Sequence, residues 1–129
     1  MDIIKNLDAE HKRIQAAVDN IRQESSRENI EALDKLLTDH ICHEETLYAL
    51  SKIEGNVGIN LDDIRKDHQK MISLLLDMKS SPTKSQLDEF LAILDGHSQY
   101  EDEVVYPFFE KTLSDDQKRS GLVCFRHAD

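Results

Sequence analysis

The feature that most constrains this chain is a repeat among the polar residues of its apolar helical stripes. Three pairs of such residues are each separated by 57 positions: His11 and His68, His40 and His97, Glu44 and Glu101. Apolar neighbours keep the same spacing, for example Leu7 with Ile64 and Ile14 with Met71. A fixed offset of this kind predicts two copies of one supersecondary unit, related by a pseudo-twofold axis.

Each copy is predicted to be a helical hairpin. Apolar residues recur at steps of three and four in four stretches, which indicate helices at about 2–24, 26–54, 61–78 and 82–111. Ser25 with Glu28 and Ser114 with Gln117 have capping-box spacing, and Ser81 before Pro82 resembles an N-cap followed by proline at the first helical position. No strand pattern competes. We therefore predict one all-α domain over 1–129, an antiparallel up-down-up-down four-helix bundle over about 2–111 with a short tail helix in 112–129.

The two hairpins place the polar residues at one level. His11 and His40 lie about 14 residues on either side of the first predicted turn, as do His68 and His97 around the second, so all four rings are expected roughly 20 Å from the turns. Each Glu lies four residues after a histidine and points into the same interior. Two buried carboxylates need a counter-charge, and four imidazoles with two carboxylates suit two divalent or trivalent ions better than one tetrahedral zinc.

Composition excludes several other classes of protein. The formal net charge of -10 disfavours nucleic acid and anionic membranes as partners, and no apolar run is long enough to cross a bilayer. We expect a soluble cytoplasmic protein, a monomer or weak homo-oligomer. Cys42 and Cys124 lie far apart without a Cys-x-x-Cys motif and are expected to be reduced thiols.

The pattern resembles the hemerythrin-like, or HHE cation-binding, family of non-heme diiron proteins over roughly residues 3–110. The ordered set His, His-x-x-x-Glu, His, His-x-x-x-Glu carries the resemblance, together with Glu10-His11, His40-Ile-Cys-His-Glu44-Glu45, Asp67-His68 and the segment from His97 to Pro107. The resemblance implies two iron ions with an oxo or hydroxo bridge, although other divalent metals are possible. It places His11 and His40 on one iron and His68 and His97 on the other, with Glu44 and Glu101 bridging.

One departure from the family pattern bears on function. The oxygen-carrying members have a histidine four residues after the one on the third helix, where this chain has Ile72, and its repeat partner is Gln15. About two coordination positions would then stay open. His43 and its repeat partner Tyr100 are candidates to complete the coordination or to form a hydrogen bond to a bridging ligand. The apolar residues at the metal level, Ile72 among them, are expected to form the core.

These features support three functions. The first is binding or sensing of a small ligand, O2, NO or peroxide, at the metal pair. The second is an enzyme that degrades peroxide or NO, in keeping with a role in oxidative stress, although no catalytic residue can be assigned. The third is iron storage or delivery, including iron-sulfur cluster repair. The physiological ligand is not fixed by the sequence.

Overall fold

The computed structural model describes residues 3–51, 59, 61–79 and 82–120 of the chain. Apart from short connections, these residues are helical, which confirms the all-α prediction. The elements in chain order are α1 (Ile3–Gln23), α2 (Arg27–Ser51), α3 (Leu61–Met78), α4 (Lys84–Tyr100), the π-helical turn η2 (Glu101–Val105), α5 (Tyr106–Thr112) and α6 (Asp115–Ser120).

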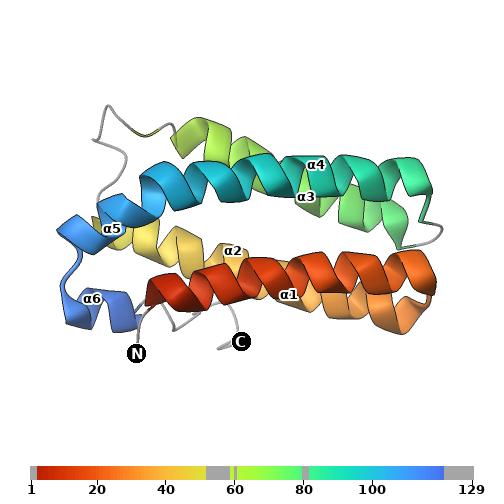
Figure 1. The fold of residues 1–129 in the computed structure, drawn as a ribbon, viewed down its shortest axis with the longest axis horizontal. Coiled ribbons are helices and arrows are strands. Elements are labelled where there is room, and N and C mark those ends of the chain that lie inside the picture. The colour runs from red at the N-terminus through yellow and green to blue at the C-terminus, as the bar shows by residue number, and fades with distance from the viewer. Residues whose placement is uncertain (1–2, 52–58, 60, 80–81, 121–129) are drawn as a thin grey trace.

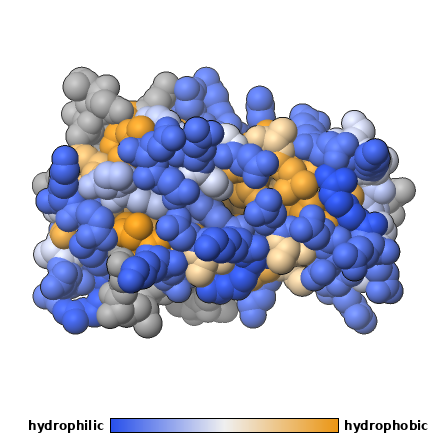
Figure 2. All heavy atoms as spheres, in the orientation of Figure 1, coloured by the Kyte–Doolittle hydropathy of each residue, from blue (hydrophilic) through white to orange (hydrophobic). Residues whose placement is uncertain are grey.

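The four long helices lie side by side in two pairs (Figure 1). Helix α2 returns along α1 after a short connection, and α4 returns along α3, while α5 and α6 lie at the end of the bundle opposite these two connections (Figure 1). No described helix is both long and apolar enough to cross a membrane. The face seen in Figure 2 is mostly hydrophilic, as the high content of charged residues leads one to expect.

Two helix starts differ from the predictions by a residue or two. The Ser26 hydroxyl, not that of Ser25, accepts a hydrogen bond from the Asn29 N–H, while the Ser25 hydroxyl donates to the Ile21 carbonyl of the preceding helix. Helix α4 starts after Thr83, whose side chain and that of Gln86 form a reciprocal capping box, so Pro82 lies before the helix. A side chain that accepts from a free helix N–H outweighs the preference of proline for the first position.

The short tail helix has the predicted start. The Ser114 hydroxyl accepts from the Gln117 N–H, and the Gln117 side chain accepts from the Ser114 N–H. The predicted end of the second helix, at about residue 54, lies outside the described residues.

The last long helix is not continuous, contrary to prediction. At η2 the Tyr106 N–H donates to the Glu101 carbonyl, five residues back, so this turn holds one residue more than an α-helical turn. Pro107 follows immediately and has no N–H, and its ring would clash with the carbonyl four residues earlier in a regular helix. We attribute the wide turn to this proline.

The apolar core consists of two clusters separated by the predicted polar level. One cluster, at the end of the α1–α2 and α3–α4 connections, includes Ile14, Leu33 and Phe90. The other, near α5 and α6, includes Leu7, Tyr48 and Phe109. His11 lies between the two clusters on α1, because Leu7 and Ile14 are one turn away on either side.

Two further expectations are wrong. Ile72 is 38% exposed and so does not belong to the core. Cys42 is disulfide-bonded rather than a reduced thiol; Cys124 lies outside the described residues.

Candidate metal centre

All six predicted ligands meet in the interior of the bundle. Their exposed fractions lie between 0% and 8%, which is rare for ionisable side chains without partners. Candidate donor atoms within 4.8 Å of one another form two overlapping groups, and Glu44 and Glu101 belong to both. One group adds His11 and His40, and the other adds His68 and His97. The structure therefore brings the histidines together in the pairs that the resemblance implies.

The two glutamates lie between the histidine pairs. Glu44 Oε1 is 3.1 Å from His40 Nε2, on its own helix, and 3.2 Å from His68 Nε2 across the bundle. Glu101 Oε1 is 3.0 Å from His11 Nε2 and 3.2 Å from His97 Nε2. Each carboxylate thus contacts a histidine of both pairs, which is the placement a bridging ligand needs.

The six side chains do not satisfy all of one another's buried nitrogen atoms with hydrogen bonds, whereas metal ions could bind those atoms. His40 is 2% exposed, yet its Nε2 makes no well-aligned hydrogen bond despite its closeness to Glu44. The Nε2 atoms of His68 and His97 face each other at 3.0 Å, so only one of the two can be the donor. Buried nitrogens left in this way are costly in a packed interior. Two cations among them would use these lone pairs and offset the charge of the carboxylates.

The protonation states favour metal binding at some groups and oppose it at others. Burial and the nearby charge of His40 lower the pKa of His11, which leaves its imidazole neutral and able to ligate. Burial alone would lower the pKa of His40, but the negative charge of Glu44 and the hydrogen bond that His40 Nδ1 donates to Glu10 outweigh it and raise the pKa to about 9. Burial would raise the pKa of Glu44, but the charge of His40, 3.1 Å away, and the hydrogen bond with His68 hold it well below its usual value. Metal binding at His40 would therefore release a proton.

Glu10 is buried and contacts two histidines at once. It is 7% exposed, with Oε1 2.8 Å from His40 Nδ1 and Oε2 2.8 Å from His43 Nδ1. Burial opposes ionisation of this carboxyl, but the hydrogen bonds with His40 and His43 lower its pKa to about 2. His43 is thereby turned toward Glu10 and belongs to neither group of candidate ligands.

The other acidic neighbours contact the remaining histidines less closely. Asp67 Oδ2 is 3.3 Å from His97 Nδ1, and Glu45 Oε1 is 3.5 Å from His68 Nδ1, which is long for a hydrogen bond. Carboxylates in these positions fix the orientation of metal-ligating imidazoles. Tyr100 packs beside the apolar cluster near α5.

Two tyrosines that the sequence analysis did not single out contact the site. The Tyr48 hydroxyl donates to Glu101 Oε2 at 2.9 Å, and the Tyr106 hydroxyl donates to Glu44 Oε2 at 2.9 Å. Tyr106 is also 3.2 Å from His11 Nε2. Burial and the Glu44 charge raise the pKa of both phenols well above its usual value, so both remain donors.

The π-helical turn explains why the repeat did not reveal them. Tyr48 follows Glu44 by four residues, but Tyr106 follows Glu101 by five, so the two tyrosines are 58 residues apart, not 57. The additional residue of η2 absorbs this difference, and each hydroxyl reaches the glutamate of the other half. A search for repeat partners that tolerated a one-residue shift before Pro107 would have found the pair.

Together, the helical fold and the buried histidine and glutamate layer define a metal-binding helical domain. A family model described as the hemerythrin HHE cation binding domain matches residues 2–85, which is more than half of the chain. The chain belongs to this family. The match ends before His97 and Glu101, whose place in the centre is given by the structure. Neither the curated proteins nor the solved structures include a significant match to the chain.

Proposed function

We propose that this protein binds two iron ions in the layer between its core clusters and uses them to bind a small ligand, O2, NO or peroxide. His11 and His40 would ligate one ion, and His68 and His97 the other, with Glu44 and Glu101 bridging. The single observation that carries the proposal is that both glutamates, fully buried, contact histidines of both pairs. The proposal takes the bundle as antiparallel up-down-up-down, which brings one side chain from every long helix to this level.

Iron is favoured over a lone zinc by the number and type of donors. Four imidazoles and two carboxylates exceed what a tetrahedral ion uses, whereas two six-coordinate ions can share them and keep positions for an exogenous ligand. Two such ions would supply redox equivalents and open coordination positions. The chain would supply a buried pocket that a large polar substrate cannot enter.

The two phenols favour peroxide degradation as a second candidate function. Tyr48 and Tyr106 each present a protonated hydroxyl to the layer where a small ligand would bind, and their raised pKa keeps those protons in place at neutral pH. Cleavage of peroxide develops negative charge on the departing oxygen, which hydrogen-bond donors that keep their protons can stabilise. Reversible binding of a diatomic ligand has no departing oxygen.

Metal analysis tests the proposed centre. Protein loaded anaerobically with Fe²⁺ and freed of excess metal should hold about two irons per chain, because the six proposed ligands together suit two ions. Glu101→Ala should lose the paired binding, whereas Glu103→Ala, an exposed carboxylate in the same turn, should keep it. Retention of two irons by Glu101→Ala would overturn the bridging assignment, and a single tightly held zinc in the natural protein would overturn the iron pair.

Ligand experiments separate the two functions. The reduced, iron-loaded protein should change its optical spectrum on addition of NO or O2 and recover it when the gas is removed. Oxygen release from added peroxide, slowed by Tyr48→Phe and Tyr106→Phe, would instead support the enzyme. A protein whose spectrum responds to none of the three ligands would exclude both.

A further inference from the structure

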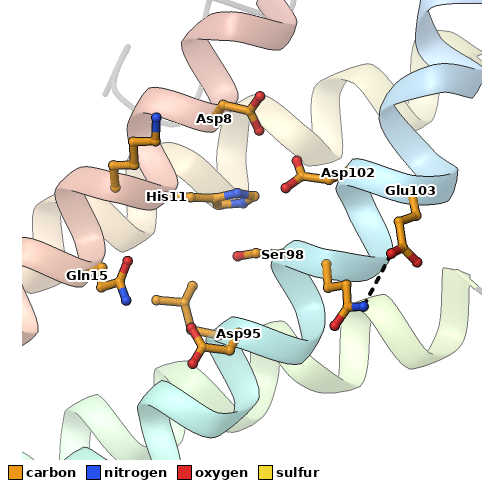
Figure 3. Close-up of a pocket in the computed structure, with 10 residues that line it drawn as sticks. Asp8, His11, Gln15, Asp95, Ser98, Asp102 and Glu103 are labelled. Atoms are coloured by element: carbon orange, nitrogen blue, oxygen red, sulfur yellow. Dashed lines mark hydrogen bonds between the residues drawn. The ribbon is translucent and has the colours of Figure 1, made fainter.

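A cavity of about 550 Å³ opens between α1 and α4 and ends at a ligand of the metal centre (Figure 3). The His11 ring lines it, and the side chains of Asp8 and Asp102 point toward one another beside this ring (Figure 3). Four of the lining residues carry carboxylates: Asp8, Asp95, Asp102 and Glu103. The one lysine among the lining residues is Lys12. A concave surface with this imbalance concentrates cations and repels anions.

His11 differs from His40 and His97 in the environment of its second ring nitrogen. His68 Nδ1 also makes no hydrogen bond to a described residue, but it is buried against Glu45. The Nδ1 atoms of His40, His97 and His68 lie 2.8, 3.3 and 3.5 Å from a carboxylate oxygen. For His11, which is 8% exposed, the described residues offer Nδ1 no hydrogen-bond partner. Yet Asp8, Asp102 and His11 each place a candidate donor atom within 4.8 Å of the others. An imidazole nitrogen that makes no hydrogen bond, on a ring that lines the cavity next to two carboxylates, is suited to a cation.

In the second half of the repeat, one of the three equivalent positions carries a positively charged side chain. Arg65 is the repeat partner of Asp8, His68 of His11, and Glu45 of Asp102. There, the guanidinium Nε and Nη2 of Arg65 lie 3.4 Å from Glu45 Oε2, and the other oxygen of Glu45 faces His68. The first half replaces this arginine with a second acid and so lacks the positive charge.

We propose that the Asp8–His11–Asp102 cluster is a transient binding site for divalent metal ions on their way into the centre. The cavity draws the ion in, the two aspartates hold it, and His11 faces both this cluster and the interior, where its Nε2 lies 3.0 Å from Glu101. The arginine of the other half closes the equivalent route. This inference rests on the proposed metal centre and assigns the path by which that centre is filled.

The test is the rate at which the metal-free protein takes up Co²⁺ at low ionic strength, followed by optical absorption in a stopped-flow instrument. Asp8→Asn combined with Asp102→Asn should slow uptake about tenfold, the lower end of what electrostatic focusing provides. Asp8→Arg, which copies the pair of the other half, should slow it at least as much. The control, Asp19→Asn with Asp77→Asn, removes the same charge from exposed positions on α1 and α3 and should leave the rate within about twofold.

The end point of the same traces distinguishes this inference from the proposed function. Slow uptake that still reaches two ions per chain in Asp8→Asn with Asp102→Asn, and in Asp8→Arg, supports the site. Uptake as fast as in the natural protein, or slowed equally by the control pair, overturns it while leaving the metal centre intact. If the natural protein takes up no pair of ions, the centre is wrong and the inference falls with it.

Discussion

Replacing Glu10 by glutamine is expected to weaken metal binding although Glu10 is not a proposed ligand. The carboxylate accepts from two imidazoles, with Oε1 at 2.8 Å from His40 Nδ1 and Oε2 at 2.8 Å from His43 Nδ1. A glutamine of the same shape offers one acceptor and one donor, so one of these contacts must break. If the amide nitrogen faces His40, that ring must either turn, so that Nε2 no longer points into the centre, or move its proton to Nε2, which then has no lone pair for a metal ion.

The expected loss follows from what such supporting contacts contribute in metal sites. Removing the partner of a ligating histidine typically costs 10–100-fold in metal affinity, or about 1.4–2.8 kcal/mol. Competition between the metal-free protein and a chromogenic chelator for Co²⁺ measures this change, and far-UV circular dichroism checks that the helices persist. Glu10→Ala should lose at least as much, because it removes both contacts.

His43→Gln serves as the matched control because it disturbs only the outer contact of Glu10. Its affinity should stay within about threefold of the natural protein, if the effect of Glu10 passes through His40. Equal losses in His43→Gln and Glu10→Gln would show that His43 itself is a ligand. Unchanged affinity in both Glu10 variants would refute the positioning role.

Three further outcomes test other parts of the structure. Tyr106→Phe should destabilise the metal-free protein by about 1.5–3 kcal/mol in urea unfolding, since a buried hydrogen bond to the Glu44 carboxylate is lost; no change would mean that the bond is absent in solution. Deleting Val104 together with Pro107→Ala should convert η2 to a regular turn, place Tyr106 four residues after Glu101 as Tyr48 lies after Glu44, and keep its hydrogen bond to Glu44; a loss as large as in Tyr106→Phe would show that η2 does more than set this register. Phe90→Ala should cost about 3–5 kcal/mol, measured the same way, because the ring is fully buried; a surface-like value below about 0.5 kcal/mol would contradict its place in the core.

The sequence was sufficient to predict the all-helical fold and the six polar side chains that meet in its interior, for a physical reason. Polar residues on an apolar stripe are costly, so His11, His40 and their repeat partners stand out against the periodic background. Helix periodicity also fixes which way a side chain points, and this carries over to Glu44 and Glu101 without knowledge of the packing.

The parts that were missed depend on contacts that no periodicity encodes. Glu10 precedes His11 in the sequence, and helix periodicity alone does not show that α2 covers it or that it contacts both His40 and His43. Tyr48 and Tyr106 look like ordinary core aromatics until the wide turn before Pro107 is known. Ile72 follows His68 by one helical turn, yet it lies at the edge of the interface, where a small rotation of α3 decides between burial and exposure.

The polar layer also divides the apolar interior into two separate halves, one near the helix connections and the other near α5 and α6. Without bound ions, these halves are joined across the layer by hydrogen bonds among buried charged groups, which are weaker ties than continuous apolar packing. The two ends of the metal-free molecule can therefore loosen independently, and filling the layer would couple them into one cooperative unit.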